Sequence, residues 1–513
     1  MKTDVLIVGA GPTGLSLACQ LVRYGIDFVI IDKNETTTQY SKAIGVQART
    51  LEIYEQIGLA DKLIEQGEIV ETVRMFAGGK VRGEAEFKEL GKGLSPYPYV
   101  LIVEQGKHET MLYDYIKSHG RDIQWQTELD SFSQDEAGVT AAVKSTAGEP
   151  KTVNAKYLVA CDGAKSVVRH ALGLEFAGST FERMFYVADV QIDWKFGHEA
   201  LQVFLMRNSM LAFFPMVGEM RYRIVGTFPE EFDKDEGDIL YSEIEERIKF
   251  DTEIELDITN VNWFSTYKVH TRHVDKFSVG RCFLAGDSAH IHSPVGAQGM
   301  NTGIQDGYNL AWKLAFVLRG KSSGELLNTY NEERLPNAEA LTKTTDRFFS
   351  LVASSDPLLV FTRMHVFPYI AQFLLSLDVV KRFVFPRISQ IKINYEDGSL
   401  AQASGSFAVN AGDRMPYFEV EGASIYDRLR EPVFHLIVFF DGKNVIPPLP
   451  VDLLNEWEGL IDSTVISLYP NIAEIFGTTK SFFVTLRPDN YIGLISNDFS
   501  PEQVRKYLNL IGR

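Results

Sequence analysis

The first 32 residues carry a hydrophobic pattern that predicts a βαβ unit. Residues 5–8 are all apolar, which is typical of a short strand buried on both faces of a parallel sheet. Residues 15–24 place apolar side chains at helical spacing, and Gly25 follows as a helix end. A second apolar run over residues 28–31 ends at Asp32, so the expected order is strand, helix, strand.

Beyond this unit the pattern changes between helical and extended periods. We expect a helix over residues 106–116 and a β-meander between residues 123 and 159, where alternating runs are joined by polar turns. A separate sheet is predicted near residues 180–270. Its expected strands are residues 186–192, 201–206, 211–216 and 222–228.

The chain then has one more buried strand before it becomes mainly helical. The apolar run 282–285 predicts the strand, and long helices are expected over residues 303–319 and 322–350. The apolar stretch 358–385 is interrupted by Arg363, His365, Asp378, Lys381 and Arg382. Because burying these groups in a bilayer costs several kcal/mol, we predict amphipathic helices there and no membrane span.

Polar and small residues between positions 391 and 405 indicate a domain boundary. After it, the pattern predicts a small α/β domain. Its expected strands are residues 434–440 and 482–486, and its expected helices are residues 453–468 and 501–510.

The composition is that of a globular protein, and its charge excludes two classes of partner. The chain has 513 residues, enough for two or three domains, with 45% hydrophobic and 23% charged residues. Its net charge of −17 would repel nucleic acids and anionic membranes over most of the surface. Cys19, Cys161 and Cys282 are too few and too scattered for a disulfide framework or a zinc cluster. Since a strand begins almost at Met1, a signal peptide has no room, and we expect a soluble, cytoplasmic protein.

Gly9, Gly11 and Gly14 form a Gly-x-Gly-x-x-Gly motif between the first strand and the first helix. Such glycines permit a tight turn and a close approach of the backbone to a pyrophosphate at a helix N-terminus. The alternative is a glycine turn that only packs the helix, but the position between two buried strands favours a dinucleotide. Asp32 follows Gly14 by 18 residues, which suits the acid that binds a free ribose. The motif therefore fits FAD or NAD and disfavours NADP at this site.

Two later strands run into a Gly/Asp pair, and each pair alone would be read as an ordinary turn. The pairs are Asp162-Gly163, within residues 157–169, and Gly286-Asp287, within residues 280–290. Three further features accompany them, namely the stretches 43–52 and 293–306 and the pair Gln105 and Glu109. With the N-terminal glycines, these segments resemble the signature of the FAD-dependent aromatic hydroxylases, the single-component flavoprotein monooxygenases. The resemblance covers essentially the whole chain.

The resemblance implies roles for particular residues. Asp287 would hydrogen-bond the ribityl chain of the flavin, Gln105 would contact its diphosphate-ribityl region, and Pro294 would lie over the isoalloxazine ring. The segment 299–301 would open a helix whose N–H groups and partial positive charge face the flavin pyrimidine. Asp162 would link FAD binding to the use of the nicotinamide cofactor, the alternative being a turn acid that caps the next helix. Lys42 stands where the family commonly has arginine, and it lacks the bidentate fork of that residue.

The full set of cofactor-binding residues that we carry over from the resemblance follows the motifs. It is Gly9, Gly11, Pro12, Thr13, Gly14, Asp32, Lys33, Lys42, Gln105, Leu129, Asp162, Gly286, Asp287, Pro294, Gly299, Met300 and Asn301.

The resemblance also implies an α/β architecture with four segments. A Rossmann-like FAD-binding domain would be formed by residues 1–180 and 273–395, the latter including helices, with a substrate-binding β-sheet domain at 181–272. Residues 412–416 and 487–493 resemble the C-terminal thioredoxin-like domain of the phenol-hydroxylase branch, which would be residues 396–513. No cysteine follows residue 282, so thiol chemistry is excluded there and a packing or dimer-contact role is what we expect.

Aromatic and methionine side chains in the predicted second sheet suggest where the substrate binds. Phe204, Met206, Phe213 and Phe214 would line the pocket, although a sheet packed on helices would use the same residues for its core. No metal site is expected, because histidines such as His290 do not stand at ligand spacing with acids or thiols.

The function implied by the resemblance is hydroxylation of a phenolic or polyketide-like aromatic substrate. NADH or NADPH would reduce the bound FAD, and O2 would then form a C4a-hydroperoxyflavin that delivers one oxygen atom. The protein would supply positioning and a dry cavity, so no catalytic side chain is expected. A plain NAD dehydrogenase would leave the two later motifs unused, and a flavin halogenase would need a Trp-x-Trp motif that is absent. The remaining alternative is a FAD-binding scaffold or regulatory protein without hydroxylase activity. Apart from the small-molecule substrate, the expected partner is a second copy in a homodimer.

Overall fold

The computed structural model describes residues 1–39, 43–145, 148, 150–206, 210–228, 239–293, 296–353, 356–367, 369–370, 378–443 and 451–512. Within these ranges the chain forms a mixed α/β fold with two eight-stranded sheets and a smaller five-stranded sheet. The mixed α/β class is the one that the sequence predicts.

The predicted βαβ unit is present at the N-terminus. It consists of β1 (Lys2–Val8), α1 (Pro12–Arg23) and β2 (Phe28–Ile31). β1 pairs in parallel with β2 and with β11 (Lys151–Ala160), and β11 pairs in parallel with β18 (Cys282–Leu284). Because these strands are parallel, the loops that follow β1, β11 and β18 meet at one edge of the sheet.

The other elements of this half complete the first sheet and cover it. The predicted meander is formed by β9 (Thr127–Gln134), β10 (Val139–Ser145) and β11, whereas β8 (Ile123–Gln124) pairs in parallel with β2, and β17 (Ser278–Val279) pairs with β18. A small sheet contains β3 (Gly45–Val46), β4 (Glu68–Val70) and β7 (Val100–Ile102). The helices are α2 (Ala48–Glu55), α3 (Ala60–Ile64), α4 (Phe87–Gly91), α5 (Gln105–Ser118) and α6 (Val167–Ala171).

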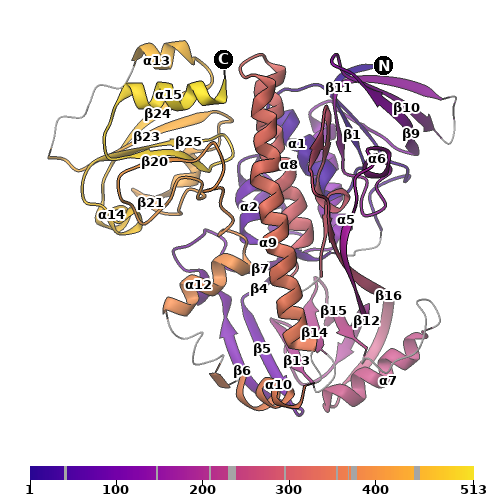
Figure 1. Ribbon diagram of the computed structural model, residues 1–513. Helices are drawn as coiled ribbons and strands as arrows, with labels where there is room; N and C mark the ends of the chain where they lie inside the picture. Colours follow the sequence, from indigo (N-terminus) through magenta and orange to yellow (C-terminus); the bar gives the residue numbers. More distant parts are fainter. Residues whose placement is uncertain are drawn as a thin grey trace.

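The second sheet contains the four strands that the sequence predicts near residues 180–270. They are β12 (Ala177–Asp193), β13 (Ala200–Leu205), β14 (Met210–Pro215) and β15 (Arg221–Thr227), joined by β16 (Asp257–His273) and β19 (His290–Ile291). α7 (Tyr241–Thr252) packs on it (Figure 1).

One hairpin of the second sheet comes from a part of the chain that we expected in the first FAD-binding segment. β5 (Thr72–Ala77) and β6 (Lys80–Glu86) pair with each other, and β5 pairs in parallel with β13. The sheet predicted for residues 181–272 therefore also draws on residues 72–86. Residues far apart in sequence form this edge, so the hydrophobic pattern alone gives no sign of it.

Two long helices run through the middle of the molecule (Figure 1). α8 (Gly299–Leu318) begins four residues before the predicted start at 303, and a 3-10 turn, η2 (Gly324–Leu327), leads into α9 (Asn328–Ala353). Further short helices are α10 (Pro357–Phe361), the π turn η3 (Thr362–Val366) and α12 (Asp378–Ile388). Among the described residues, every helix is too short or too polar to cross a membrane.

The C-terminal region forms its own five-stranded sheet beside α8 and α9 (Figure 1). Its strands are β20 (Gln402–Ser404), β23 (Phe434–Phe440), β24 (Ile461–Ser467), β25 (Phe482–Leu486) and β26 (Ile492–Ser496). They are accompanied by β21 (Glu419–Val420), β22 (Ala423–Ser424), η4 (Ile425–Arg428), α13 (Val451–Glu456), α14 (Pro470–Phe476) and α15 (Pro501–Ile511).

The predicted helix over residues 453–468 is wrong in its second half. α13 ends at Glu456, and β24 follows at Ile461–Ser467, where it pairs in parallel with β23. Ile461, Val465 and Ile466 are β-branched, and such residues fit a pleated strand better than a helix. The thioredoxin-like assignment of this domain stays a prediction.

Candidate functional site

The loops after β1, β11 and β18 pack directly against one another. Gly9 has a φ of +104°, and a Cβ atom there would lie 2.3 Å from the carbonyl oxygen of Cys161. A Cβ on Gly286 would lie 2.5 Å from Oγ1 of Thr13, and one on Gly303 would lie 2.3 Å from the same atom. Only glycine allows these approaches. The three separate motifs of the sequence are thus neighbours in space.

The N-terminus of α1 has the properties of a phosphate site. Pro12 is its first residue and Gly11 precedes it, so the first N–H groups of the helix have no partner within the helix. Among the described residues, a Cβ on Gly11 would meet nothing within 4 Å, whereas a Cβ on Gly14 would lie 2.0 Å from the carbonyl oxygen of Gly9. Gly11 therefore faces open space and Gly14 faces the protein. This geometry fits a pyrophosphate at the helix start.

Asp32 lies beside this loop at the end of β2. Its Oδ2 accepts a hydrogen bond of 2.7 Å from the N–H of Ala10, and its Oδ1 accepts one of 2.8 Å from Asn34. The carboxylate is partly exposed, so it retains acceptor capacity for a ribose hydroxyl. Lys33 is exposed next to it, and the side chain of Leu129 is buried in the core at β9.

The 3-10 turn η1 (Gly286–Ser288) holds Asp287 at the end of β18. The N–H of Gly286 donates to Oδ2 of Asp306 at 2.9 Å, and Oγ of Ser288 donates to the carbonyl of Ala160 at 2.7 Å. Asp287 is exposed while Gly286 and Ser288 are buried. The turn therefore presents one carboxylate outward from a rigid base, as a ligand for polyol hydroxyls requires.

Asp306, which the sequence analysis did not single out as a site residue, anchors this turn from below. Its carboxylate binds Nε2 of His290 and Nε of Arg334, each at 2.7 Å, and all three side chains are buried. Burial alone would raise the pKa of Asp306, but Arg334 and His290 outweigh it and hold the pKa below its usual range. Asp306 belongs to the stretch 293–306 that carried the resemblance, but its partner Arg334 lies 28 residues away.

The start of α8 lies in the same place, and Asn301 fastens it to the segment before α2. Oδ1 of Asn301 accepts from the N–H of Gln47 at 2.9 Å and from Oγ1 of Thr50 at 2.7 Å. Its Nδ2 donates to the carbonyls of Gly45 and Ala297 at 2.9 and 2.8 Å. The Asn301 side chain is therefore used by the fold, which leaves the backbone N–H groups of the first turn to face a ligand.

His292 lies against this helix start. A Cβ on Gly299 would lie 3.4 Å from its Nε2, and its Nδ1 donates to the carbonyl of Ser293 at 2.8 Å. Burial lowers the pKa of His292 to about 4, so the imidazole is neutral. Met300 is partly buried. The predicted residues Lys42 and Pro294 lie outside the described residues.

Gln105 begins α5 and contacts the segment that precedes β3. Its Oε1 accepts from the N–H of Ala43 at 3.1 Å, and its Nε2 donates to Oε1 of Glu109 at 2.8 Å. Glu109 also accepts from the N–H of Thr38 at 2.7 Å, and burial raises its pKa. The pair thus holds the backbone at Thr38 and at Ala43.

Asp162 caps α6, as the alternative reading of the sequence expected. Its Oδ2 accepts from the N–H groups of Val167 and Val168 at 2.8 and 3.4 Å. Its Oδ1 is buried without a hydrogen-bond partner among the described residues. Burial raises the pKa of the carboxyl group. An orphaned acceptor beside Gly9 fits a donor supplied by a bound group, so capping and cofactor contact are compatible.

The second sheet has two faces with different neighbours. Phe204, Met206 and Phe213 belong to a packed core with Ile244 and Ile248 of α7, and the rings of Phe204 and Phe213 are 5.1 Å apart. This is the core role that the sequence analysis gave as the alternative to pocket lining.

Phe214 points to the opposite face, because successive side chains alternate along β14. It pairs across the sheet with Arg223, and Arg221, two residues earlier on the same face, binds Glu104 at 3.2 Å. Glu104 directly precedes Gln105, so this face is turned toward the predicted FAD-binding half. Arg223 forms a buried ion pair with Asp189 at 2.5 Å on this face.

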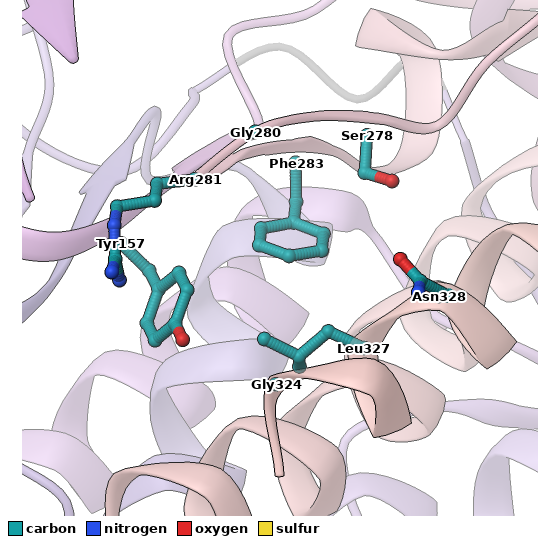
Figure 2. Close-up of a pocket in the computed structure, with 8 residues that line it drawn as sticks. All are labelled: Tyr157, Ser278, Gly280, Arg281, Phe283, Gly324, Leu327 and Asn328. Carbon is teal, nitrogen blue, oxygen red and sulfur yellow. The ribbon is translucent and has the colours of Figure 1, made fainter. Parts of the chain in front are cut away.

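A surface hollow of about 240 Å³ lies elsewhere, at the β17–β18 hairpin and η2 (Figure 2). Its lining residues are Tyr157, Ser278, Gly280, Arg281, Phe283, Gly324, Leu327 and Asn328. The guanidinium of Arg281 donates to the carbonyls of Asp135, Glu136 and Lys156. None of the predicted cofactor or substrate residues lines this hollow, so it is distinct from the site.

The three cysteine thiols are kept in their protonated form by burial. Burial raises the pKa of all three cysteines, to about 12 for Cys282. Within the described ranges, no group of histidine, cysteine and acidic side chains could hold a metal ion.

Comparisons with known proteins agree with this geometry. The model of the FAD binding domain family matches residues 2–345. A flavin-dependent monooxygenase of Mycobacteroides abscessus is 32% identical over 98% of this chain and 99% of its own length. A 6-methylpretetramide 4-monooxygenase of Streptomyces rimosus is 31% identical over 85% of this chain and 79% of its own. The solved structure of OxyS anhydrotetracycline hydroxylase from Streptomyces rimosus has a TM-score of 0.76 at 25% identity, covering 99% of both chains. The chain thus belongs to the family of FAD-dependent monooxygenases that hydroxylate aromatic compounds.

Proposed function

We propose that this monooxygenase hydroxylates a polycyclic, polyketide-like phenol with NADPH or NADH as the reductant. The observation that carries the proposal is that close approaches of Thr13, Gly286 and Gly303 bring together the start of α1, the turn of Asp287 and the first turns of α8, and that Phe214 of the second sheet packs against the core of the same half. Two of the similar proteins bear names that place 6-methylpretetramide and anhydrotetracycline as their substrates, which supports a large ring system.

The residues that we propose to hold FAD follow from the site. The N-terminus of α1 at Gly11 and Pro12 would bind the pyrophosphate, and Asp32 would accept from the ribose hydroxyls. Asp287 would accept from the ribityl hydroxyls, and the first turn of α8 would donate to the pyrimidine carbonyl. When bound, the flavin supplies the redox chemistry and the activation of O2.

In this scheme the chain itself orients the cofactor and the substrate and keeps water out of the site. The partial positive charge at the start of α8 stabilises negative charge on a ligand that faces it. Neutral His292 beside Gly299 adds a hydrogen-bond acceptor and no competing positive charge. For the substrate, we favour the face that presents Phe214 over the α7-packed core with Phe204, Met206 and Phe213.

The division of the chain that we propose keeps the predicted segments with one addition. Residues 1–180 and 273–395 would hold FAD, residues 181–272 with the β5–β6 hairpin would hold the substrate, and residues 396–513 would form the thioredoxin-like domain. A homodimer and a cytoplasmic location stay part of the proposal.

The test is substrate-stimulated oxidation of NADPH or NADH by the purified, FAD-loaded protein. A panel of simple phenols and of polycyclic phenols should show stimulation by the polycyclic members, with a product heavier by one oxygen atom. Measuring H2O2 separates true hydroxylation from uncoupled oxidation. A yellow protein that gains no activity with any panel member would favour the scaffold alternative over catalysis.

A further inference from the structure

A buried cluster of charges joins the C-terminal domain to the two long helices. Arg487 binds Glu333 of α9 through both guanidinium arms, at 2.5 and 3.0 Å, and it binds Asp489 at 2.6 Å. Lys313 of α8 binds Glu333 at 2.8 Å, and Nε1 of Trp312 donates to Asp489 at 3.1 Å. The four charged side chains are at most 1% exposed, so the C-terminal domain is docked through charges that water does not reach.

The same segment of the C-terminal domain also contacts α2. Arg49 donates to the backbone carbonyl of Asp489 at 3.1 Å and binds Glu52 at 3.2 Å. The other oxygen of Glu52 binds Arg414 of the C-terminal domain at 3.0 Å. Arg49 therefore spans from its own helix to the C-terminal domain, and it is itself buried.

The residue after Arg49 contacts the start of α8. Thr50 donates to Oδ1 of Asn301 at 2.7 Å, and Asn301 fixes the first turn of α8. One turn of α2 thus touches the C-terminal domain with Arg49 and the start of α8 with Thr50. A shift of this turn would move the N–H groups that are proposed to face the flavin.

A second connection runs through α9 to the turn that carries Asp287. Arg334 donates to Oδ1 of Asp306 at 2.7 Å and to the hydroxyl of Tyr395 at 3.1 Å. The ring of Tyr395 lies 4.3 Å from that of Tyr491, in the C-terminal domain. Asp306 in turn holds the N–H of Gly286. Both elements proposed to bind the flavin are therefore tied to residues 487–491.

Buried ion pairs contribute little net stability to the contact between two domains. Burying an ion pair loses about as much hydration energy as the pair returns, and apolar side chains of similar volume often dock as well or better. What a bidentate arginine provides is a fixed direction and distance. Arg487 holds both Glu333 and Asp489 in this way, so its effect is to set a geometry.

We propose that residues 487–491 of the C-terminal domain are a positioning element for the cofactor site. Through Arg49 and α2 they hold the start of α8, and through Tyr395, Arg334 and Asp306 they hold the turn at Asp287. This gives the C-terminal domain a role in place of the thiol chemistry that it lacks. The inference depends on the proposed function, because it takes FAD to bind at that start and that turn.

The wild-type chain provides the first test, since coupling between sites is reciprocal. If residues 487–491 position the cofactor site, added FAD slows backbone hydrogen exchange over residues 487–493, which are not among the residues proposed to bind it. Exchange over α14, which lies on the far side of the same domain, serves as the internal control for global stabilisation (Figure 1). Slowing at 487–493 beyond that at α14 supports the inference, and equal exchange with and without bound FAD overturns it. Flavin fluorescence in the same samples shows whether FAD binds, and a chain that binds none overturns the proposed function instead.

The variant Arg49→Lys tests the connection through α2. A lysine keeps the charge but cannot hold both the Asp489 carbonyl and Glu52. We expect FAD affinity to fall about tenfold, the visible spectrum of the bound flavin to shift, and the FAD-dependent slowing at 487–493 to disappear. Arg430→Lys is the matched control, because Arg430 also bridges to α2, at Glu55 with 3.6 Å, but is 49% exposed. If Arg49→Lys fails to fold, Arg414→Lys takes its place. Wild-type affinity and spectrum in a folded variant would refute the positioning role.

Discussion

At the scale of single residues, substitutions of Gly11 and Gly14 distinguish an effect on cofactor binding from an effect on folding. A Cβ on Gly11 would meet no atom within 4 Å in the part of the chain that the structure describes, while one on Gly14 would lie 2.0 Å from the carbonyl oxygen of Gly9. We therefore expect Gly11→Val to leave the fold intact but to fill the space proposed for the pyrophosphate. The protein should purify colourless, with a thermal midpoint close to that of the wild-type apoprotein.

Gly14→Ala, in contrast, should destabilise the fold. Its Cβ meets backbone rather than a flexible side chain, so the loop or α1 must shift, at a cost of about 1–3 kcal/mol. Circular dichroism measures the stability of the fold, and absorbance at flavin wavelengths measures the flavin content. A Gly11→Val protein that purifies yellow would remove the phosphate role of this loop.

His108 gives the molecule a pH dependence that does not involve the cofactor. It is fully buried in α5, its Nε2 lies 2.8 Å from the hydroxyl of Tyr54, and burial lowers its pKa from 6.5 to about 4. The unfolded chain thus binds one more proton at this position between these two values. Its contribution to the free energy of unfolding is complete above pH 6.5 and is lost toward pH 4, by about 1.4 kcal/mol per pH unit.

The variant His108→Gln should reduce that slope, since an amide does not titrate. Urea unfolding at pH 7, 6 and 5 measures the effect. His119→Gln, on the exposed end of the same helix region, should retain the wild-type slope. Equal slopes for wild type and His108→Gln would assign the pH dependence to other groups.

At the scale of elements, the sequence predicts best the strands that are almost entirely apolar. The bounds of β2, β23 and β25 coincide with the predicted ranges 28–31, 434–440 and 482–486. Such runs are short and rich in β-branched and aromatic residues, which favours a strand over a buried helix. The sequence does not predict β24, because Ile461–Ser467 mixes apolar and polar residues without a strict period. The partner strand of β24 decides its conformation.

The contact between α1 and α8 is the element-scale feature on which the site depends. Gly303 allows α8 to approach Thr13 of α1 and Gly286. Alanine favours a helix over glycine by about 1 kcal/mol, but its Cβ would lie 2.3 Å from Oγ1 of Thr13 and 3.1 Å from Cα of Gly286. We expect the clash to win in Gly303→Ala, with a net loss of about 1–2 kcal/mol of stability and weaker FAD retention.

Gly324→Ala is the control for that prediction, because a Cβ at position 324 would meet nothing within 4 Å. It should leave both unfolding and flavin content unchanged. Thermal unfolding of the apoproteins, followed by titration with FAD, distinguishes the two variants. A Gly303→Ala protein more stable than wild type would mean that the helices can separate without cost.

At the scale of the whole molecule, most residues of the candidate site could be predicted from the sequence, but the buried ion pairs that hold the surrounding elements in place could not. The glycines and Asp287 stand in motifs, so the sequence predicts that these residues lie close together. The ion pairs of Arg487 with Glu333 and of Arg414 with Glu52 join residues 154 and 362 positions apart. A single sequence carries no periodic signal for contacts of that kind, since each partner alone reads as an ordinary charged residue.

The C-terminal domain and the FAD-binding half also share one hydrophobic core. Phe434 of β23 packs against Trp312 and Phe316 of α8, with ring centroids 5.9 and 5.6 Å apart. Together with the buried charges, this contact makes independent unfolding of the C-terminal domain costly. We therefore expect the chain to unfold as one cooperative unit, with the flavin released in the same transition.

Phe439→Ala tests this cooperativity from a position remote from the cofactor. Phe439 is fully buried in the internal core of the C-terminal domain, where it stacks on Phe482 at 4.6 Å. Its truncation should cost about 3–5 kcal/mol. The temperature of flavin release, followed by fluorescence, should then fall as much as the temperature of unfolding, followed by circular dichroism. Phe250→Ser, at a residue 80% exposed on α7, should change neither temperature. Flavin release that stays at the wild-type temperature while the C-terminal domain melts earlier would show that the two halves unfold separately.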